Sequence, residues 1–300
     1  MNNFPKIYIS PINKSILMAI QKFDPNRNRI GYIVSQRQHT NHGGYVSKNI
    51  TDVIFNQGFL IERDHFCMKD FDKSMIEYDA SKFDIIHIDP WYFNQYNINE
   101  TKIWIKDFLD FRADILFEFG TEDFIKELTI AEYKAALDSL GEYLGNILYL
   151  VSQGGSVVFD LQNISPIDVS KTESFINFSK SLGIKTKRHN CDFHTDDELK
   201  ILSDLGVSAY NYAPEFTYIS NKIIFNKLSP KELEIVNKEI IEKAPWHRWL
   251  NDTSIKEKNA LACLHYVEYL PEVEQYILES ESEVVDSVVA RLEEIWRIVS

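Results

Sequence analysis

Cysteine is scarce in this sequence, which contains only Cys67, Cys191 and Cys263 among its 300 residues. Three widely spaced cysteines do not make the disulfide framework of a small secreted domain or the paired thiols of a cysteine-rich zinc module. The first residues, Met1 to Lys6, also lack the apolar stretch and the small-residue cleavage site of a signal peptide. We therefore expect a soluble protein of the reducing cytoplasm.

Positive charge and long apolar runs are also in short supply. The chain has 32 lysines and arginines against 45 aspartates and glutamates, which gives a formal net charge of -13. This balance argues against nonspecific binding to nucleic acid or to an anionic membrane, because both require a basic surface. No apolar run approaches the roughly 20 residues of a membrane-spanning helix. We predict neither a nucleic-acid nor a membrane partner.

The sequence does contain a regular alternation of short apolar runs and longer segments with helical spacing. Hydrophobic residues make up 44% of the chain and charged residues 26%, which suits a large core with a solvated surface. The apolar runs that we interpret as strands begin at Ile7, Ile30, Leu60, Phe83, Ile115, Ile147, Ile184 and Val207. Strands with little polar alternation are typically buried on both faces. Eight such strands separated by helices predict an α/β fold, the (β/α)8 TIM barrel.

The pattern changes after Asn211. The segments 214–225, 230–242, 255–269 and 272–299 all have helical spacing, with no strand between them. We predict a (β/α)8 barrel over residues 1–228 and a helical extension over residues 229–300 that packs on the barrel. One aromatic-rich connector, Trp246 to Leu250, lies within the extension. We interpret it as a packing hinge in preference to a ligand platform.

Three predicted strands end in polar side chains that suit metal chemistry. The third strand ends at Asp64 and His65, the fifth runs into Glu122, and the seventh runs into His189. Because the carboxyl ends of all barrel strands face one mouth, these side chains are expected to converge. Two imidazoles and one carboxylate can hold a divalent metal while leaving a position open for substrate. We therefore predict a metal site at His65, Glu122 and His189, with zinc as the expected ion.

Each of these assignments has an alternative. Glu122 also fits a carboxylate that stabilises the N-terminus of a helix, and His194 competes with His189 for the third ligand position. His87 fits an interior histidine with satisfied hydrogen bonds. Asp64 directly precedes a predicted ligand, and neighbouring residues of a regular strand point to opposite faces. Asp64 can therefore reach the same cavity only if the strand bulges or ends there.

Seven short segments give the sequence a resemblance to a known family. They are Ser35-Gln36-Arg37-Gln38, Gly43-Gly44-Tyr45-Val46, Arg63-Asp64-His65, His87-Ile88-Asp89, Phe117 to Glu122, His189 to Phe193 and Asn211 to Phe216. In order and spacing they resemble the class II D-tagatose-bisphosphate aldolase accessory-subunit-like proteins, and Trp246 to Trp249 extends the resemblance. It implies a class II aldolase-type TIM barrel related to sugar-acid C4 epimerases. It also implies a divalent metal at His65, Glu122 and His189, with Asp64 as the acid/base.

These features lead to a functional hypothesis. We expect a metal-dependent carbohydrate enzyme that uses retro-aldol chemistry on a ketose or ketose phosphate, as an aldolase or a C4 epimerase. Asp64 and Glu118 are the candidate catalytic residues. The candidate substrate-binding residues are Gln38, Tyr45, Asp89, Gln153, Asn190, Asp192 and Asn211. The alternative is a non-catalytic subunit that stabilises a separate class II ketose-bisphosphate aldolase. The candidate macromolecular partners are therefore an aldolase chain and further copies of this chain.

Overall fold

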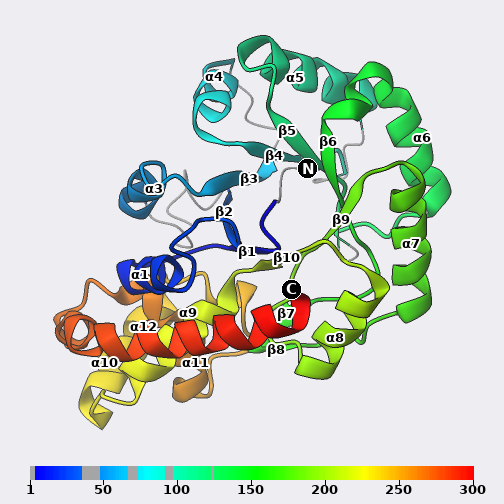
Figure 1. The fold of residues 1–300 in the computed structure, drawn as a ribbon. Coiled ribbons are helices and arrows are strands. Elements are labelled where there is room, and N and C mark those ends of the chain that lie inside the picture. The colour runs from blue at the N-terminus through cyan, green and yellow to red at the C-terminus, as the bar shows by residue number, and fades with distance from the viewer. Residues whose placement is uncertain (1–3, 36–47, 67–72, 92–96, 123–124) are drawn as a thin grey trace.

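The computed structural model describes residues 4–35, 48–66, 73–91, 97–122 and 125–300. Its parallel strands close into one barrel in the order β1-β10-β9-β6-β5-β4-β3-β2 (Figure 1). These strands are β1 (Ile7–Ile9), β2 (Ile30–Ser35), β3 (Leu60–Phe66), β4 (Ile85–Ile88), β5 (Leu116–Phe119), β6 (Ile147–Val151), β9 (Lys185–Arg188) and β10 (Ala209–Tyr212). The predicted TIM barrel is confirmed, and each strand begins within two residues of its predicted start.

Helices cover the outside of the barrel. They are α1 (Lys14–Phe23), α3 (Lys48–Ile54), α4 (Lys73–Lys82), α5 (Ile98–Phe111), α6 (Ile130–Leu140), α7 (Val169–Ser181), α8 (Asp196–Leu205) and α9 (Pro214–Phe225). Thr129 and Thr195 each form a capping box with a glutamate three residues later, which satisfies free N–H groups where α6 and α8 begin. Among the described helices, none is both long enough and apolar enough to cross a bilayer.

Side chains fill the barrel at its amino-terminal end. Tyr8, Ile33, Ile85, Tyr149 and Ala209 form a separate apolar cluster of buried residues from five strands. The hydroxyls of Tyr8 and Tyr149 lie 3.2 Å apart, and that of Tyr149 donates to the carbonyl of Pro5, just before β1. Because this end is plugged, the open space of the barrel lies toward the carboxyl ends of the strands, where TIM barrels place their active sites.

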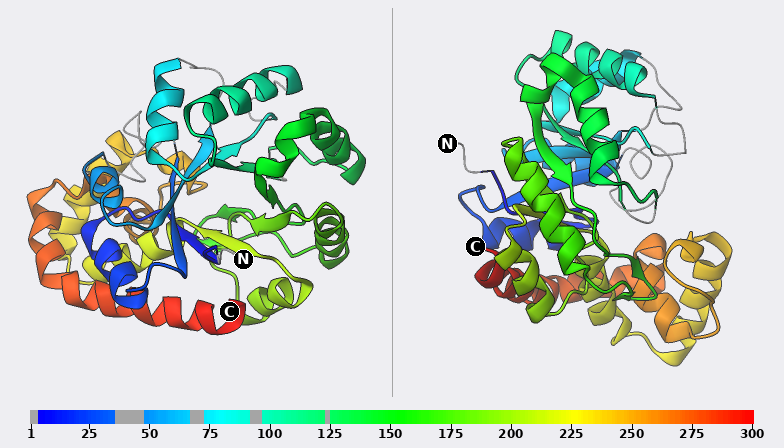
Figure 2. Two further views of the ribbon diagram at one scale, coloured as in Figure 1. Left: turned by 45° about the horizontal axis from the view of Figure 1, so that its top comes forward. Right: turned by 90° about the vertical axis from the view of Figure 1, so that its right-hand side faces the viewer.

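The C-terminal part of the chain is a helical extension. It contains α10 (Pro230–Lys243), α11 (Lys256–Cys263) and α12 (Pro271–Val299). Helix α12, red in Figure 1, packs against α1, α8 and α9, and its residues Val284, Val288 and Leu292 belong to the same core as the barrel. In the right-hand view of Figure 2, α10 and α11 lie at the end of the barrel away from the N-terminus. The domain boundary at residues 228 and 229 stays a prediction.

A short antiparallel hairpin lies between β6 and α7. Its strands are β7 (Val158–Phe159) and β8 (Gln162–Asn163). The sequence did not predict it, because strands of two residues are too short to show an alternating pattern. The backbone N–H of Asp160, in the hairpin turn, donates to the carbonyl of Trp249 at 2.8 Å. The hairpin therefore connects the barrel to the helical extension.

Candidate active site

Asp64 and His65 face the same cavity because strand β3 contains a bulge. The register between β3 and β4 shifts between Arg63 and Phe66, so two residues of β3 lie opposite one residue of β4. His65 has a φ of 45°, an uncommon conformation for a residue other than glycine. A bulge of this kind redirects a side chain that a regular strand would turn away. Asp64 and His65 consequently both line the cavity.

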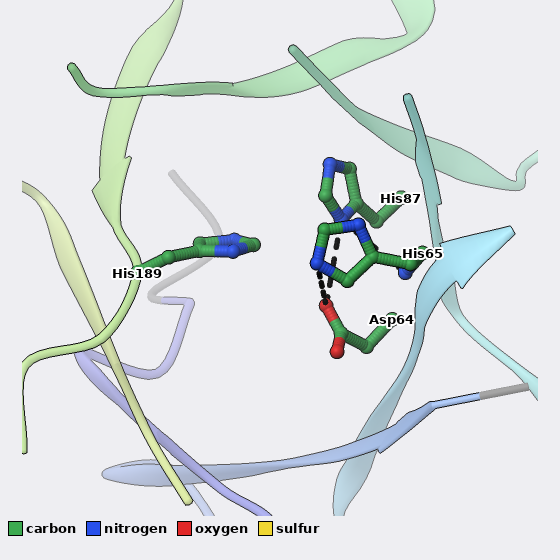
Figure 3. A group of neighbouring side chains, drawn as sticks. All are labelled: Asp64, His65, His87 and His189. Carbon is green, nitrogen blue, oxygen red and sulfur yellow. Dashed lines mark hydrogen bonds and ion pairs between the residues drawn. The ribbon is translucent and has the colours of Figure 1, made fainter. Parts of the chain in front are cut away.

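The three predicted metal ligands meet at this bulge. Oε1 of Glu122 lies 3.3 Å from Nε2 of His65 and 2.8 Å from Nδ1 of His189. Figure 3 shows His65, His87 and Asp64 grouped together, with His189 pointing toward them from another strand. Donor atoms of Asp64, His65, His87 and His189 also lie within 4.8 Å of one another. Two overlapping sets of candidate ligands are thus brought together, and both contain His65 and His189.

Two buried carboxylates hold the imidazoles of His65 and His189 in place. Oδ2 of Asp89 lies 3.6 Å from Nδ1 of His65, which leaves Nε2 directed at Glu122. Glu118 contacts Nε2 of His189, which leaves Nδ1 directed at Glu122. Metal-binding histidines commonly contact a carboxylate through the nitrogen that does not bind the metal. Asp89 and Glu118 are not among the described residues that line the cavity, so their positions suit orientation of the histidines.

His87 uses both ring nitrogens within the protein. Its Nε2 lies 3.1 Å from the carbonyl of Gly120 and donates to it. Its Nδ1 lies 3.3 Å from the backbone nitrogen of His65, whose N–H donates to it, and 3.4 Å from Oδ1 of Asp64. Both ring nitrogens of His87 therefore contact protein groups. These contacts agree with its interpretation as an interior histidine, and they show that it supports the bulge.

The electrostatics of the centre favour ionised carboxylates. Burial would raise the pKa of Asp64, but the neighbouring imidazoles, first that of His65, lower it to about 2. Burial would also raise the pKa of Glu122, but His65 and His189 hold it below its usual range. Conversely, burial would lower the pKa of His189, but Glu118 and Glu122 raise it to about 10. The carboxylates therefore stay ionised at neutral pH and require positive charge beside them.

This set of donors fits a divalent metal. The carboxylates around the three imidazoles are Asp64, Asp89, Glu118 and Glu122. If the imidazoles are neutral, the excess negative charge can be balanced by one divalent cation in place of protons. Oε2 of Glu122 is buried and has no hydrogen-bond partner among the described residues. His65, Glu122 and His189 provide the nitrogen and oxygen donors that a catalytic zinc prefers.

A second charged cluster, which the sequence analysis missed, lies beneath the histidines. Lys187 contacts Glu62 and lies 2.9 Å from Oε2 of Glu118, and all three side chains are completely buried. Burial would lower the pKa of Lys187, but the two glutamates raise it. The two carboxylates therefore favour the protonated ammonium form of Lys187. The sequence could have indicated this cluster, because Glu62 lies two residues before Asp64 and Lys187 lies two residues before His189. Residues two apart on a strand point to the same face.

A cavity of about 650 Å³ adjoins the candidate metal centre. This volume lies in the range of small-molecule sites. The predicted site residues that line it are Asp64, His65, Glu122, His189, Asn190, Asp192 and Asn211. Val158 and Phe159 of the hairpin and Arg248 and Trp249 of the extension complete part of the wall. The combination of polar and apolar surface suits a small polyhydroxylated molecule.

Three predicted substrate-binding residues line the cavity: Asn190, Asp192 and Asn211. They differ in whether their side chains already bind other groups of the protein. Oδ1 of Asn211 is buried without a hydrogen-bond partner among the described residues, so it is available to a ligand. Nδ2 of Asn190 donates to the carbonyl of Ser156 at 3.3 Å. Oδ1 of Asp192 accepts the backbone N–H groups of Ala213 and Glu215, both at 2.9 Å, and thereby holds the start of α9. Asn211 is therefore the best placed of the three to bind a substrate hydroxyl.

Other predicted residues lie away from the cavity or outside the described part of the chain. Gln153 is not among the described lining residues, and its amide group binds the backbone between β5 and α6, including the N–H of Leu128 at 2.9 Å. His194 lies 3.1 Å from the hydroxyl of Ser156, so His189 is the histidine that meets Glu122. Gln38 and Tyr45 lie outside the described residues.

Comparison with solved structures finds proteins of similar fold. No protein-family model matches the sequence, and no curated protein matches it. A "probable tagatose 6 phosphate kinase" from Sinorhizobium meliloti is 13% identical with a TM-score of 0.73, over 96% of this chain and 90% of that chain. The likeness establishes the fold.

Two further solved structures have the same architecture. A fructuronate-tagaturonate epimerase from Cohnella laeviribosi is 10% identical with a TM-score of 0.66, over 99% of this chain and 81% of that one. A fructose-bisphosphate aldolase from Campylobacter jejuni is 13% identical with a TM-score of 0.60, over 99% and 91%. The expected likeness to aldolase and sugar-acid epimerase barrels is thus confirmed at the level of the fold.

Proposed function

We propose that this chain is a metal-dependent carbohydrate enzyme that uses retro-aldol chemistry on a ketose or ketose phosphate, as an aldolase or a C4 epimerase. The main support is the convergence of His65, Glu122, His189 and Asp64 beside one cavity. The aldolase and the epimerase among the barrels of similar fold agree with this proposal. The cytoplasmic location, the identity of the metal as zinc and the macromolecular partners stay predictions.

The proposed chemistry divides the work among residues of different strands. A divalent metal held by His65, Glu122 and His189 would supply a Lewis acid for the substrate carbonyl. Asp64 takes the proton of the substrate hydroxyl while the carbon–carbon bond breaks, and returns it when a bond re-forms. Asn211 binds a substrate hydroxyl through its free Oδ1. Cleavage leaves an aldehyde and an enolate: protonation of the enolate carbon and release of both fragments give an aldolase, whereas rotation of the aldehyde and its re-addition give an epimerase.

Metal content tests the ligand assignment. Alanine at His65, Glu122 or His189 is expected to lower the bound zinc sharply, because each change removes one of three donors. Alanine at His194 or His247 is expected to leave it unchanged, since neither belongs to the set of donors. The measurement is elemental analysis of protein loaded with zinc and then desalted. Equal zinc in all five variants would remove the assignment.

A panel of substrates tests the reaction itself. The purified chain is incubated with zinc and with ketose phosphates, neutral ketoses and keto sugar acids in deuterated buffer, and products are identified by NMR. Cleavage products indicate an aldolase, and a new stereoisomer indicates an epimerase. A chain that takes up no metal and acts only in a complex with an aldolase would instead be the non-catalytic subunit.

A further inference from the structure

Arg248 is the one permanently charged cation among the described residues that line the cavity. Asp64, Glu122 and Asp192 line the same cavity, and the chain as a whole is acidic. Even so, none of the described carboxylates forms an ion pair with Arg248, whose side chain is half-buried. The five N–H donors of the guanidinium are therefore available to a ligand in the cavity.

The segment that carries Arg248 is held in place on both sides. It forms a short 3-10 turn, η3 (Trp246–Arg248), in which the N–H of Arg248 donates to the carbonyl of Pro245 at 3.1 Å. Nε1 of Trp249 donates to the hydroxyl of Tyr266 at 3.1 Å. The carbonyl of Trp249 accepts the hydrogen bond from the β7-β8 hairpin described above. The backbone of the connector is thus held by hydrogen bonds on both sides of Arg248, whose side chain lines the cavity.

We propose that Arg248 binds the anionic group of the substrate, a phosphate or a carboxylate attached to a polyhydroxylated chain. A guanidinium matches the geometry of either group through paired N–H donors. The cavity has room for such a molecule together with the reacting carbons beside Asp64. This inference rests on the proposed function, and it narrows the substrate class to a ketose phosphate or a keto sugar acid, to the exclusion of neutral ketoses.

The test compares the binding of three small ligands to the full chain by calorimetry. Glycerol phosphate carries a phosphate, glycerate carries a carboxylate, and glycerol carries neither. The unaltered protein is expected to bind at least one charged ligand roughly tenfold or more tightly than glycerol, since hydrogen bonds to charged groups are the stronger ones. The charged ligand that is preferred indicates which anionic group Arg248 binds.

The variant Arg248→Met removes the charge and keeps most of the length of the side chain. We expect it to weaken binding of the charged ligand roughly tenfold to a hundredfold while binding of glycerol changes little. Arg297→Met is the matched control, because Arg297 is an exposed arginine of α12 that does not line the cavity. It is expected to bind like the unaltered protein. Arg248→Gln replaces Arg248→Met if the latter does not fold.

Two results overturn the inference: an unaltered protein without preference for a charged ligand, or an Arg248 variant that keeps the full preference. Binding is measured on zinc-loaded protein and again on protein treated with a chelator, so the result does not depend on turnover. If the chain takes up no metal but the Arg248 variant loses the preference for a charged ligand over glycerol, the proposed retro-aldol chemistry is wrong. The assignment of Arg248 as the residue that binds an anion is then still supported. If turnover is found but the Arg248 variant keeps the preference for a charged ligand, only the proposal that Arg248 binds the anionic group is wrong.

Discussion

Asp64→Asn is expected to lower turnover by about a hundredfold or more while the fold and most of the bound metal are retained. Asp64 lines the cavity, and its Oδ1 lies 3.9 Å from Nε2 of His65, next to the candidate metal site. Its pKa of about 2 keeps the carboxylate ionised at neutral pH. Asparagine has nearly the same shape but cannot accept the proton of a substrate hydroxyl. The measurement is kcat on the substrate identified from the panel.

His65→Ala is the companion variant, because it is expected to lose metal and activity together. The pair therefore separates proton transfer from metal binding. If Asp64→Asn turns over at a near-normal rate, Asp64 only supports the histidines. Asp192 would then be the next carboxylate to examine, since it lines the same cavity whereas Asp89 and Glu118 do not belong to the described lining residues.

Lys187→Met is expected to lower the free energy of unfolding by about 3–5 kcal/mol, the usual cost of removing one partner from a buried ion pair. The substitution leaves Glu62 and Glu118 completely buried without their shared cation. It also removes the contact of the Lys187 ammonium with the ring of Tyr8, whose centre is 3.7 Å away. Denaturant unfolding curves measure the change. Because Glu118 also contacts His189, a weaker uptake of zinc is expected as well.

Lys185→Met is the control for this change, because Lys185 lies on the same strand with an exposed side chain. Its effect is expected to stay within about 1 kcal/mol, as for most surface substitutions. Equal stabilities of the two variants would contradict the argument.

The loss caused by Lys187→Met should grow with pH. Burial, and then Glu118, raise the pKa of Glu62 well above its usual range, while Lys187 opposes the rise. Without Lys187, the carboxyl of Glu62 stays protonated to still higher pH in the folded state but not in the unfolded state. Above the pKa that Glu62 has in the unfolded chain, the folded state of the variant then binds more protons than the unfolded state. The free energy of unfolding of the variant therefore falls as pH rises. The loss is expected to be larger at about pH 8 than at about pH 5.

The barrel could be predicted from the sequence because strand and helix signals are local. Runs such as Ile30 to Val34 and Ile147 to Val151 are apolar over their whole length, and the capping threonines Thr129 and Thr195 mark helix starts within a few residues. The convergence of strand ends follows from the topology alone. This is why His65, Glu122 and His189 could be proposed together before their distances were known.

The details of the site could not be predicted, because they depend on register and on contacts between distant residues. The shift in β3 that turns both Asp64 and His65 to the cavity has no local signature in the sequence. The ion pair of Lys187 with Glu62 joins strands far apart in the chain. Gln153 follows a strand as a substrate-binding residue would, yet its amide is used by the backbone of the neighbouring loop.

The hydrogen bond between Asp160 and Trp249 joins the β7-β8 hairpin to the helical extension, and both contribute residues to the cavity wall. The strands of the barrel carry the imidazoles and carboxylates, whereas Arg248 and Trp249 come from the helical extension. Substitutions in the extension can therefore alter which molecule fits the cavity without disturbing the alignment of Asp64 with the histidines. Under the proposed function, the cation that binds the anionic group of the substrate and the carboxylate that moves the proton come from separate parts of the chain.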